Sequence, residues 1–334
     1  MKIFITGVAG FLGSHLADLM ISEGHSVAGN DNMIGGYTDN VPQNVEFYQI
    51  DCCDLENMTK AMEGCDVVYH TAATAYEGLS VFSPVLVTRN IFEASVATIT
   101  AAIRNKVKRI VYCSSMARYG HHDSVPYKED YECRPQDPYG IAKKAGEDVL
   151  INLCETHGVE YVIAVPHNIV GPRQKYDDPF RNVMSIMLNR MLQGKQPIVY
   201  GDGKQQRCFS YIDDCLYCLN ALAFQDNVVG EVINIGPDEE PVTINELAEA
   251  CANETGLNLD PIHHKDRPKE VKLATCSSDK ARKLLDYQTS TNMRQAVKKT
   301  AEYIRTRGTK KFQYHLPLEI INEHTPDTWK KKLI

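Results

Sequence analysis

The feature that most constrains the fold is a run of three glycines with the spacing G-x-x-G-x-x-G near the beginning of the sequence. An apolar segment over residues 3–5 precedes Gly7, and residues 14–23 after Gly13 carry apolar side chains at helical spacing. The glycines therefore lie at a turn between a strand and a helix. Gly7 and Gly10 allow the backbone to turn tightly and to approach a phosphate group, which the free amides of the helix can bind.

An acidic residue closes the next predicted strand. This strand covers residues 26–31 and ends in Asp31. A carboxylate at this position accepts hydrogen bonds from both hydroxyls of an adenosine ribose and repels a 2′-phosphate. The order strand, glycines, helix, strand and acid therefore predicts a site for NAD rather than NADP. A simple tight turn is the alternative interpretation of the glycines by themselves.

Strands and helices continue to alternate after this first unit. Further strands are predicted over 45–50, 66–70, 109–113 and 159–165, with helices over 55–63, 90–105 and 139–157 between them. This alternation is typical of an α/β fold with a doubly wound parallel sheet, which binds ligands beyond the carboxyl ends of its strands. Small or polar residues follow several of these strands. We expect such a domain over residues 1–172.

Beyond residue 172 the regular alternation weakens. Helices are predicted over 181–192, 213–223, 244–255 and 293–304, with a short strand over 198–200 and extended chain over 207–212. We therefore expect residues 173–334 to form a smaller, mainly helical lobe that packs against the first domain and binds substrate. Its last part, residues 310–334, is basic, and we interpret it as a mostly surface extension without an assigned role.

Composition limits the class of protein and its partners. The 334 residues are 43% hydrophobic and 24% charged, as in ordinary globular proteins. We expect no membrane segment, because no apolar run reaches about 18 residues. No basic and apolar leader precedes the first strand, so we predict a cytoplasmic protein. The net charge of −7 disfavours a nucleic-acid surface, and an anionic substrate would need a local cationic pocket.

The eleven cysteines are scattered, mostly at apolar positions, as expected of buried thiols in a reducing compartment. Cys215 and Cys218 have C-x-x-C spacing, but no second pair and no histidine cluster completes a metal site. We therefore interpret these two side chains as thiols in the core of a helix, and we predict no metal.

A tyrosine and a lysine lie on one face of the predicted helix 139–157. Tyr139 and Lys143 are four residues apart, one helical turn. Free tyrosine titrates near pH ~10, so a neighbouring ammonium and a positively charged ring are needed to make it a base at neutral pH. Lys143 is placed to supply the ammonium. The alternative is an exposed pair on a solvated helix face.

With the three glycines and Ser115, the Tyr139-x-x-x-Lys143 motif resembles the extended short-chain dehydrogenase/reductase family, in its NAD-dependent sugar-nucleotide epimerase and dehydratase branch. The resemblance covers roughly residues 1–305 and is closest to the UDP-glucose 4-epimerase type. It implies a Rossmann-type fold and NAD as cofactor. It also implies that Tyr139 is the acid/base, that Lys143 holds the nicotinamide ribose, and that Ser115 bonds the reacting oxygen.

The glycine turn, the loops at the strand ends and this resemblance together give a predicted set of cofactor-binding residues. The set is Gly7, Gly10, Phe11, Leu12, Gly13, Asp31, Asn32, Asp51, Cys52, Thr71, Ala72, Ala73, Asn90, Tyr139, Lys143 and Pro166.

A second predicted set binds the substrate and comes mainly from the second lobe. The set is Ser115, Met116, Asn168, Asn182, Val183, Arg207 and Arg267. By the resemblance, the two asparagines contact the nucleotide diphosphate and the two arginines grip its pyrophosphate. Guanidinium groups suit this task because they fork onto phosphate oxygens and stay charged. A surface salt bridge is the alternative for each arginine.

The residues after Ser115 limit which of the family's reactions we expect. In the family, 4,6-dehydratases place an Asp-Glu pair there, decarboxylases place a Glu nearby, and 3,5-epimerases place a Cys acid/base. Here Met116 and Ala117 occupy the corresponding positions. Elimination therefore lacks its acid/base pair, and 4-epimerisation, which needs one base and a hydride shuttle, remains.

The sequence thus predicts an NAD-dependent 4-epimerase of a nucleotide-diphospho-sugar, with a UDP-hexose favoured. A dehydratase or reductase, or a non-catalytic dinucleotide-binding sensor, is the alternative. Arg118 and His167 depart from the family pattern and leave the sugar open; His167 either touches the sugar or packs as a hydrogen-bonded core residue. Family members pair through two long helices, so we expect a homodimer built on residues 90–105 and 139–157.

Overall fold

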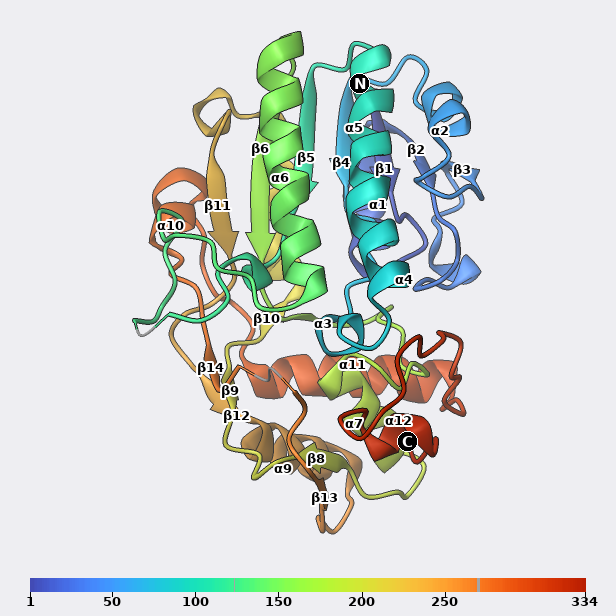
Figure 1. The fold of residues 1–334 in the computed structure, drawn as a ribbon, viewed down its shortest axis with the longest axis vertical. Coiled ribbons are helices and arrows are strands. Elements are labelled where there is room, and N and C mark those ends of the chain that lie inside the picture. The colour runs from blue at the N-terminus through green and yellow to red at the C-terminus, as the bar shows by residue number, and fades with distance from the viewer. Residues whose placement is uncertain (123, 269–270) are drawn as a thin grey trace.

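The computed structural model describes residues 1–122, 124–268 and 271–334, and it confirms the doubly wound α/β fold. The strands of the main sheet are β1 (Lys2–Thr6), β2 (Ser26–Asn30), β3 (Val45–Tyr48), β4 (Val67–His70), β5 (Arg109–Cys113), β6 (Glu160–Pro166) and β11 (Val232–Ile235). They pair in parallel in the order β11-β6-β5-β4-β1-β2-β3. Their carboxyl ends point toward a second lobe (Figure 1).

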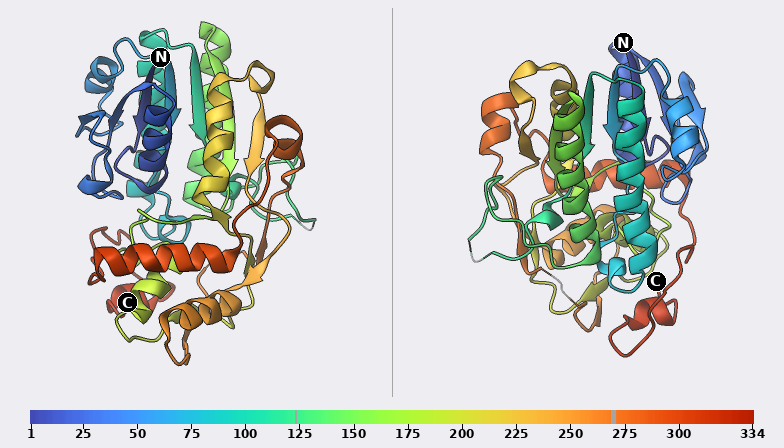
Figure 2. Two further views of the ribbon diagram at one scale, coloured as in Figure 1. Left: turned by 180° about the vertical axis from the view of Figure 1, so that it is seen from behind. Right: turned by 45° about the horizontal axis from the view of Figure 1, so that its top comes forward.

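Helices cover both faces of this sheet (Figures 1 and 2). One face carries α2 (Leu55–Ala61), α5 (Ala94–Arg104) and α6 (Pro138–His157), and the other carries α1 (Phe11–Ser22), α8 (Ile212–Phe224) and α10 (Asp279–Leu285). Alternate residues of each strand enter opposite cores, so Ile3 and Ile5 pack with α1 and α8 while Phe4 packs with α2 and α5. The sheet is therefore buried on both sides, as parallel sheets are.

Local signals determine where α6 begins and ends. The Asp137 carboxylate accepts a hydrogen bond from the Gly140 N–H at 2.8 Å, and Pro138 occupies the first turn. Gly158 ends the helix in the left-handed conformation, with φ of 70°. These signals place Tyr139 in the first turn of α6, at the edge of the sheet that faces the second lobe.

The helix predicted over 90–105 is the later part of a longer helical segment. That segment is α4 (Pro84–Thr88), a π-helical turn η2 (Arg89–Glu93) and then α5. Both η2 and α4 pack against α6. The two long helices of the predicted dimer surface therefore lie side by side on one face of the molecule (Figure 1).

The seventh strand was not predicted from the sequence. β11 extends the sheet beyond β6, although the chain has already built part of the second lobe before reaching it. Its Val-Ile-Asn-Ile run is short, and a run of this length cannot be assigned to a strand by periodicity. The helices α8 and α10, also from beyond residue 172, cover the same end of the sheet.

The second lobe has its own core around α7 (Val183–Met191), α9 (Ile244–Thr255) and α11 (Met293–Arg307). Short pairings complete it: β7 (Ile169–Val170) with β10 (Ser210–Tyr211), β8 (Ile198–Tyr200) with β13 (Ile262–His264), and β9 (Gln206–Arg207) with β12 (Val242–Thr243) and β14 (Leu273–Ala274). Short helical turns are η1 (Thr38–Asn40), α3 (Glu77–Ser80), η3 (Met116–Arg118) and η4 (Asp226–Val228). α11 runs across the lobe below the sheet (Figure 1).

The basic segment 310–334 is anchored more firmly than predicted. Most of its residues are exposed, but the short helix α12 (Asp327–Lys330) buries Trp329, which is 2% exposed. The Trp329 ring packs edge-on against Phe82 and Phe180, with centroids 6.0 and 5.4 Å apart. The segment therefore belongs to the packed structure, through an aromatic cluster that it completes.

The cysteines are free, and all but Cys53 and Cys133 are buried. Cys215 and Cys218 lie in the core between α8 and the sheet, as predicted. Among the described residues, no group of three or more His, Cys, Asp or Glu side chains could hold a metal ion. No helix in that part of the chain is long and apolar enough to cross a membrane.

Candidate active site

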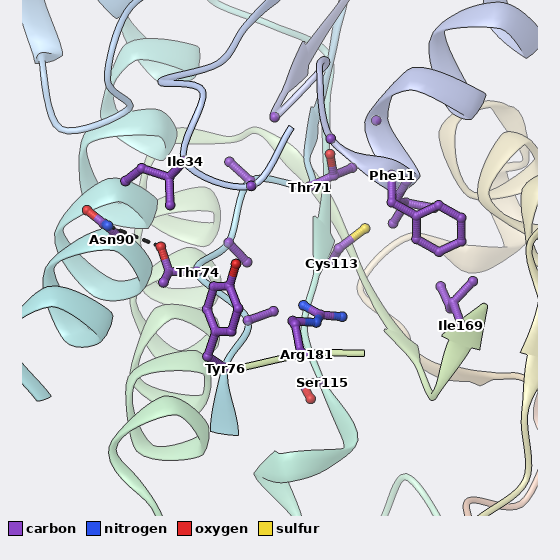
Figure 3. A pocket seen from close by; sticks show the side chains of 18 of the residues that line it. Phe11, Ile34, Thr71, Thr74, Tyr76, Asn90, Cys113, Ser115, Ile169 and Arg181 are labelled. Atoms are coloured by element: carbon purple, nitrogen blue, oxygen red, sulfur yellow. Dashed lines mark hydrogen bonds between the residues drawn. The ribbon is translucent and has the colours of Figure 1, made fainter. Parts of the chain in front are cut away.

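Two adjoining cavities lie at the carboxyl ends of the sheet strands. The first cavity runs along the glycine turn and the ends of β1, β2, β4 and β5; the second lies against α7, β9 and segment 310–334. Residues that line both cavities mark their junction: Ala75, Tyr76, Glu77, Met116, Asn168, Arg181 and Asn182. Figure 3 looks into the first cavity.

The predicted site residues gather in these two cavities. Every residue predicted to bind the cofactor lines the first cavity. Of the residues predicted to bind substrate, Ser115 lines the first cavity, Met116, Asn168 and Asn182 line both, and Val183, Arg207 and Arg267 line the second. The residues predicted to bind the cofactor and those predicted to bind the substrate thus line two adjoining cavities.

At Gly7 and Gly13, the turn between β1 and α1 accommodates only glycine. Gly7 has φ of +71°, and a Cβ on Gly13 would lie 2.3 Å from the Gly7 carbonyl oxygen. No side chain caps the helix, whose N-cap is Gly10. The first amides of α1 therefore remain open toward the cavity, an arrangement that fits the diphosphate of a dinucleotide.

Asp31 follows the end of β2 and is 6% exposed. Its carboxylate accepts hydrogen bonds from the N–H groups of Ala9 at 3.1 Å and Met33 at 2.7 Å. Burial raises the pKa of this carboxyl, and the backbone hydrogen bonds oppose the rise. Since a carboxylate has about four lone-pair sites, Asp31 can still accept from ribose hydroxyls, while a 2′-phosphate would meet a buried acid. The residues present fit NAD.

The far rim of the first cavity is held by hydrogen bonds between loops. Asn32 donates to Asp51 at 3.3 Å, next to Asp31. Asn90 donates to the Thr74 hydroxyl at 3.1 Å, the dashed line in Figure 3. These contacts tie the loops after β2 and β4 to their neighbours, so that the cavity is largely preformed.

Ser115, Tyr139 and Lys143 converge from two elements at the inner end of the first cavity. Ser115 follows β5 and accepts a hydrogen bond from the Ala117 N–H at 3.2 Å. Tyr139 is 5% and Lys143 1% exposed. Ser115 lies near enough to the Tyr139 phenol to lower its pKa, and the Lys143 ammonium donates to the Cys113 carbonyl at 2.8 Å.

Burial is the main cause of the shifted pKa values of Tyr139 and Lys143. It raises the pKa of Tyr139 well above the ordinary value; the negative charge of Glu77 adds to the rise, while Ser115 and Arg181 oppose it. Burial lowers the pKa of Lys143 to about 8. The phenol is therefore protonated at neutral pH in the free protein, and further positive charge in the cavity is needed for it to act as a base.

A buried ion pair lies behind these residues. Glu147, one turn after Lys143 on α6, accepts a hydrogen bond from the Ser114 hydroxyl and pairs with Arg118 at 2.9 Å. Both side chains are nearly inaccessible, at 1% for Glu147 and 7% for Arg118. Glu147 was not predicted, although its four-residue spacing from Lys143 places it on the same face of α6. Arg118 departs from the family pattern, and this ion pair explains its presence, because it joins η3 to α6.

The two asparagines of the substrate set lie where the cavities meet. Asn168 has φ of +47° and donates to the Cys208 carbonyl at 3.0 Å. Asn182 is the N-cap of α7 and accepts from the Met184 N–H at 3.2 Å. Both side chains are thus fixed by the backbone of the second lobe, with the cavity on their other side.

The two arginines lie on the wall of the second cavity. Arg207, on β9, donates to the Gln206 carbonyl at 2.7 Å. The Arg267 guanidinium lies 4.9 Å from the centre of the Tyr200 ring. A Cβ on Gly78 would lie 3.4 Å from Arg267 and 3.5 Å from the Trp329 ring, so segment 310–334 reaches this wall.

His167 is a packed residue, in agreement with one of the two interpretations. It is 1% exposed, and its Nε2 hydrogen-bonds the Pro237 carbonyl at 2.9 Å. Four residues of the junction were not predicted: Ala75, Tyr76, Glu77 and Arg181. No motif marks them, because each comes from a loop or short turn whose position depends on contacts distant in the sequence.

Comparison with known proteins gives a consistent result. The NAD dependent epimerase/dehydratase family model matches residues 3–236. A putative UDP-glucose 4-epimerase of Methanocaldococcus jannaschii is 31% identical over 314 residues, which are 91% of this chain and 98% of that protein. A UDP-N-acetyl-alpha-D-glucosaminuronate decarboxylase of Bacillus cytotoxicus is 29% identical over 319 residues, with 91% and 98% covered. The crystal structure of UDP-glucose 4-epimerase from Thermotoga maritima with UDP-glucose has a TM-score of 0.86 at 30% identity, covering 92% of this chain and 99% of that one.

Proposed function

Because the chain belongs to the NAD-dependent epimerase/dehydratase family, as its motifs predict, we propose that it is a 4-epimerase of a nucleotide-diphospho-sugar, with a UDP-hexose as the favoured substrate. NAD is its cofactor. The observation that carries the proposal is the inner end of the first cavity, where Tyr139 lies near Ser115, while Met116 and Ala117, on the wall of the adjoining second cavity, bring neither acid nor base. The 4-epimerases among the relatives support it.

Each residue has one task in this reaction. NAD, held along the glycine turn and Asp31, would supply the hydride acceptor and donor for C4 of the sugar. Tyr139 removes the proton of the C4 hydroxyl and gives it back, and Ser115 holds that oxygen by a hydrogen bond. Lys143 lies one turn away and contributes its charge to the cavity. Arg207 and Arg267 hold the diphosphate at the far end, so that the sugar can turn over at the junction.

One observation favours a second candidate function. Glu77 lines both cavities, and its charge acts on Tyr139. A carboxylate at this place could supply the second acid/base of a dehydratase, in place of the residues missing at positions 116 and 117.

Product analysis separates the two functions. The purified protein is mixed with UDP-glucose, UDP-N-acetylglucosamine and UDP-glucuronate without added reductant, and the products are followed by NMR and mass spectrometry. A C4 epimer of unchanged mass supports the epimerase. A product lighter by one water supports the dehydratase, and unchanged sugars in every reaction, with NAD bound, would indicate a sensor without catalytic activity.

A further inference from the structure

An arginine that the proposed chemistry does not use lies at the junction of the two cavities. Arg181 immediately precedes α7 and lines both cavities. Figure 3 shows its side chain pointing into the cavity, between Tyr76 and Ser115. Its positive charge acts on both Tyr139 and Lys143. The guanidinium therefore lies at the reacting end of the site.

Arg181 packs against an aromatic ring, and in the described part of the chain no carboxylate pairs with its guanidinium. Its guanidinium lies 5.9 Å from the centre of the Tyr76 ring. Within the part of the chain that the structure describes, it forms no ion pair and no hydrogen bond. The buried Asp178 carboxylate nearby already accepts from the Tyr76 hydroxyl and from the Phe180 N–H at 2.8 Å.

The other cations of the two cavities have different positions or partners. Arg207 and Arg267 line the second cavity only. Lys143 donates to the Cys113 carbonyl, and Lys175 pairs with Asp177 at 3.3 Å. Among the described residues, Arg181 is thus the cation shared by both cavities, and its charge acts on Tyr139, the proposed base at C4. A guanidinium with this freedom suits an anionic group on the ligand.

We propose that Arg181 binds a carboxylate on the sugar, and that the preferred substrates are nucleotide-diphospho-hexuronates. This inference rests on the proposed function, because it takes C4 to lie at Tyr139. The C6 carboxylate of a hexuronate is attached to C5, the neighbour of C4, so with C4 at Tyr139 it reaches the cavity into which Arg181 points. Arg181 is near enough to Tyr139 for its charge to act on that phenol. The diphosphate, at the opposite end of the sugar, is left to Arg207 and Arg267.

The test compares two substrates in four proteins. kcat/KM is measured for UDP-glucuronate and UDP-glucose with the wild type, Arg181→Gln, Arg181→Lys and Arg104→Gln. Arg104 is a surface arginine paired with Glu56 at 2.9 Å, so its loss is a control for net charge alone. The wild type should prefer UDP-glucuronate, and Arg181→Gln should lose on the order of 10- to 100-fold more kcat/KM on that substrate than on UDP-glucose, where only the effect of the Arg181 charge on Tyr139 is lost. Arg181→Lys should recover part of the loss, and Arg104→Gln should equal the wild type.

Two results would overturn the inference. An equal loss on both substrates in Arg181→Gln would show that Arg181 acts on something common to both reactions and not on a carboxylate, and a wild type that prefers UDP-glucose irrespective of Arg181 would show no carboxylate site. Thermal melting and NAD content of each variant verify that folding and cofactor binding are intact.

Binding measurements separate this inference from the proposed function. If no C4 epimer forms from any sugar, the epimerase proposal fails. Calorimetric titration then still decides the role of Arg181. Tighter binding of UDP-glucuronate than of UDP-glucose, lost in Arg181→Gln, would support the carboxylate site, and equal affinities would contradict it.

Discussion

At the scale of single residues, the proposed chemistry depends on two buried groups whose pKa values shift in opposite directions. Burial raises the pKa of the Tyr139 phenol and lowers the pKa of the Lys143 ammonium, because both charged forms lose water. Both shifts disfavour the charged forms that a base and its supporting cation require. Bound ligands must change this balance, so catalysis and cofactor binding are linked at these two side chains.

Replacing Tyr139 by Phe removes the acid/base and leaves the ring in place. We expect turnover to fall by at least about 100-fold, since general acid/base groups contribute on this order, while NAD remains bound. Steady-state rates and cofactor content of the purified variant measure the two effects. Wild-type rates in Tyr139→Phe would remove this residue from the mechanism.

Lys143 should make the stability of the protein depend on pH. Its pKa falls from the ordinary 10.5 to about 8 in the folded chain, so between these values the unfolded state binds more protons. Stability therefore rises with pH in this window, and the cost of burying the charge is fully present below pH 8.

Urea unfolding at pH 7 and pH 10 tests this dependence, with Lys143→Met as the reference that cancels all other titrations. The free energy of unfolding of the wild type should gain on the order of 2 kcal/mol relative to Lys143→Met over this interval. An unchanged or reversed difference would contradict the lowered pKa.

At the scale of elements, the buried pair of Glu147 and Arg118 connects α6 to η3, the turn that carries Ser115 as its N-cap. Since the pair has little access to water, its main effect is to fix how these two elements pack. Correct packing here sets the distance between the Ser115 hydroxyl and the Tyr139 phenol.

Glu147→Leu would leave the Arg118 guanidinium buried without its partner. We expect a loss of about 3–5 kcal/mol in the free energy of unfolding, because an unpaired buried charge is costly. The double variant Glu147→Leu/Arg118→Leu should recover much of this loss, measured by chemical denaturation. If the double variant were as unstable as the single one, the cost would come from packing and not from charge.

The fold could be predicted from the sequence where it is determined by interactions between residues close together in the chain. The turn between β1 and α1 and the start of α6 are set by neighbours within a few residues, and both were predicted. β11 and the anchoring of Trp329 depend on contacts with segments far away in the chain, and periodicity does not report these. The same holds for Arg181: it lies at the junction because the segment between β7 and α7 contacts Tyr76, about a hundred residues earlier in the chain.

At the scale of the whole molecule, one face carries apolar side chains without a covering element in this chain. Val85 on α4, Phe92 on η2 and Ile141 on α6 are 69%, 38% and 53% exposed. The elements that carry them pack together. A homodimer formed by two long helices from each subunit, as a four-helix bundle, stays a prediction, and such a dimer would cover these three side chains.

An acidic residue in the middle of this face should separate the subunits. We expect the wild type to be a dimer in light scattering and Ile141→Asp to be a monomer, because a buried carboxylate at an apolar interface costs several kcal/mol. A surface change on the opposite side of the sheet, Glu23→Lys, is the matched control. A wild type that is monomeric at all concentrations would contradict the expected interface.

The aromatic cluster around Trp329 has a practical consequence. The chain contains one tryptophan, and that residue lines the second cavity. Indole emission therefore reports from a single place, a few ångströms from Arg267 and the short helix α3. A nucleotide sugar bound as proposed would change the surroundings of this ring, so the protein carries a built-in optical probe of the second cavity.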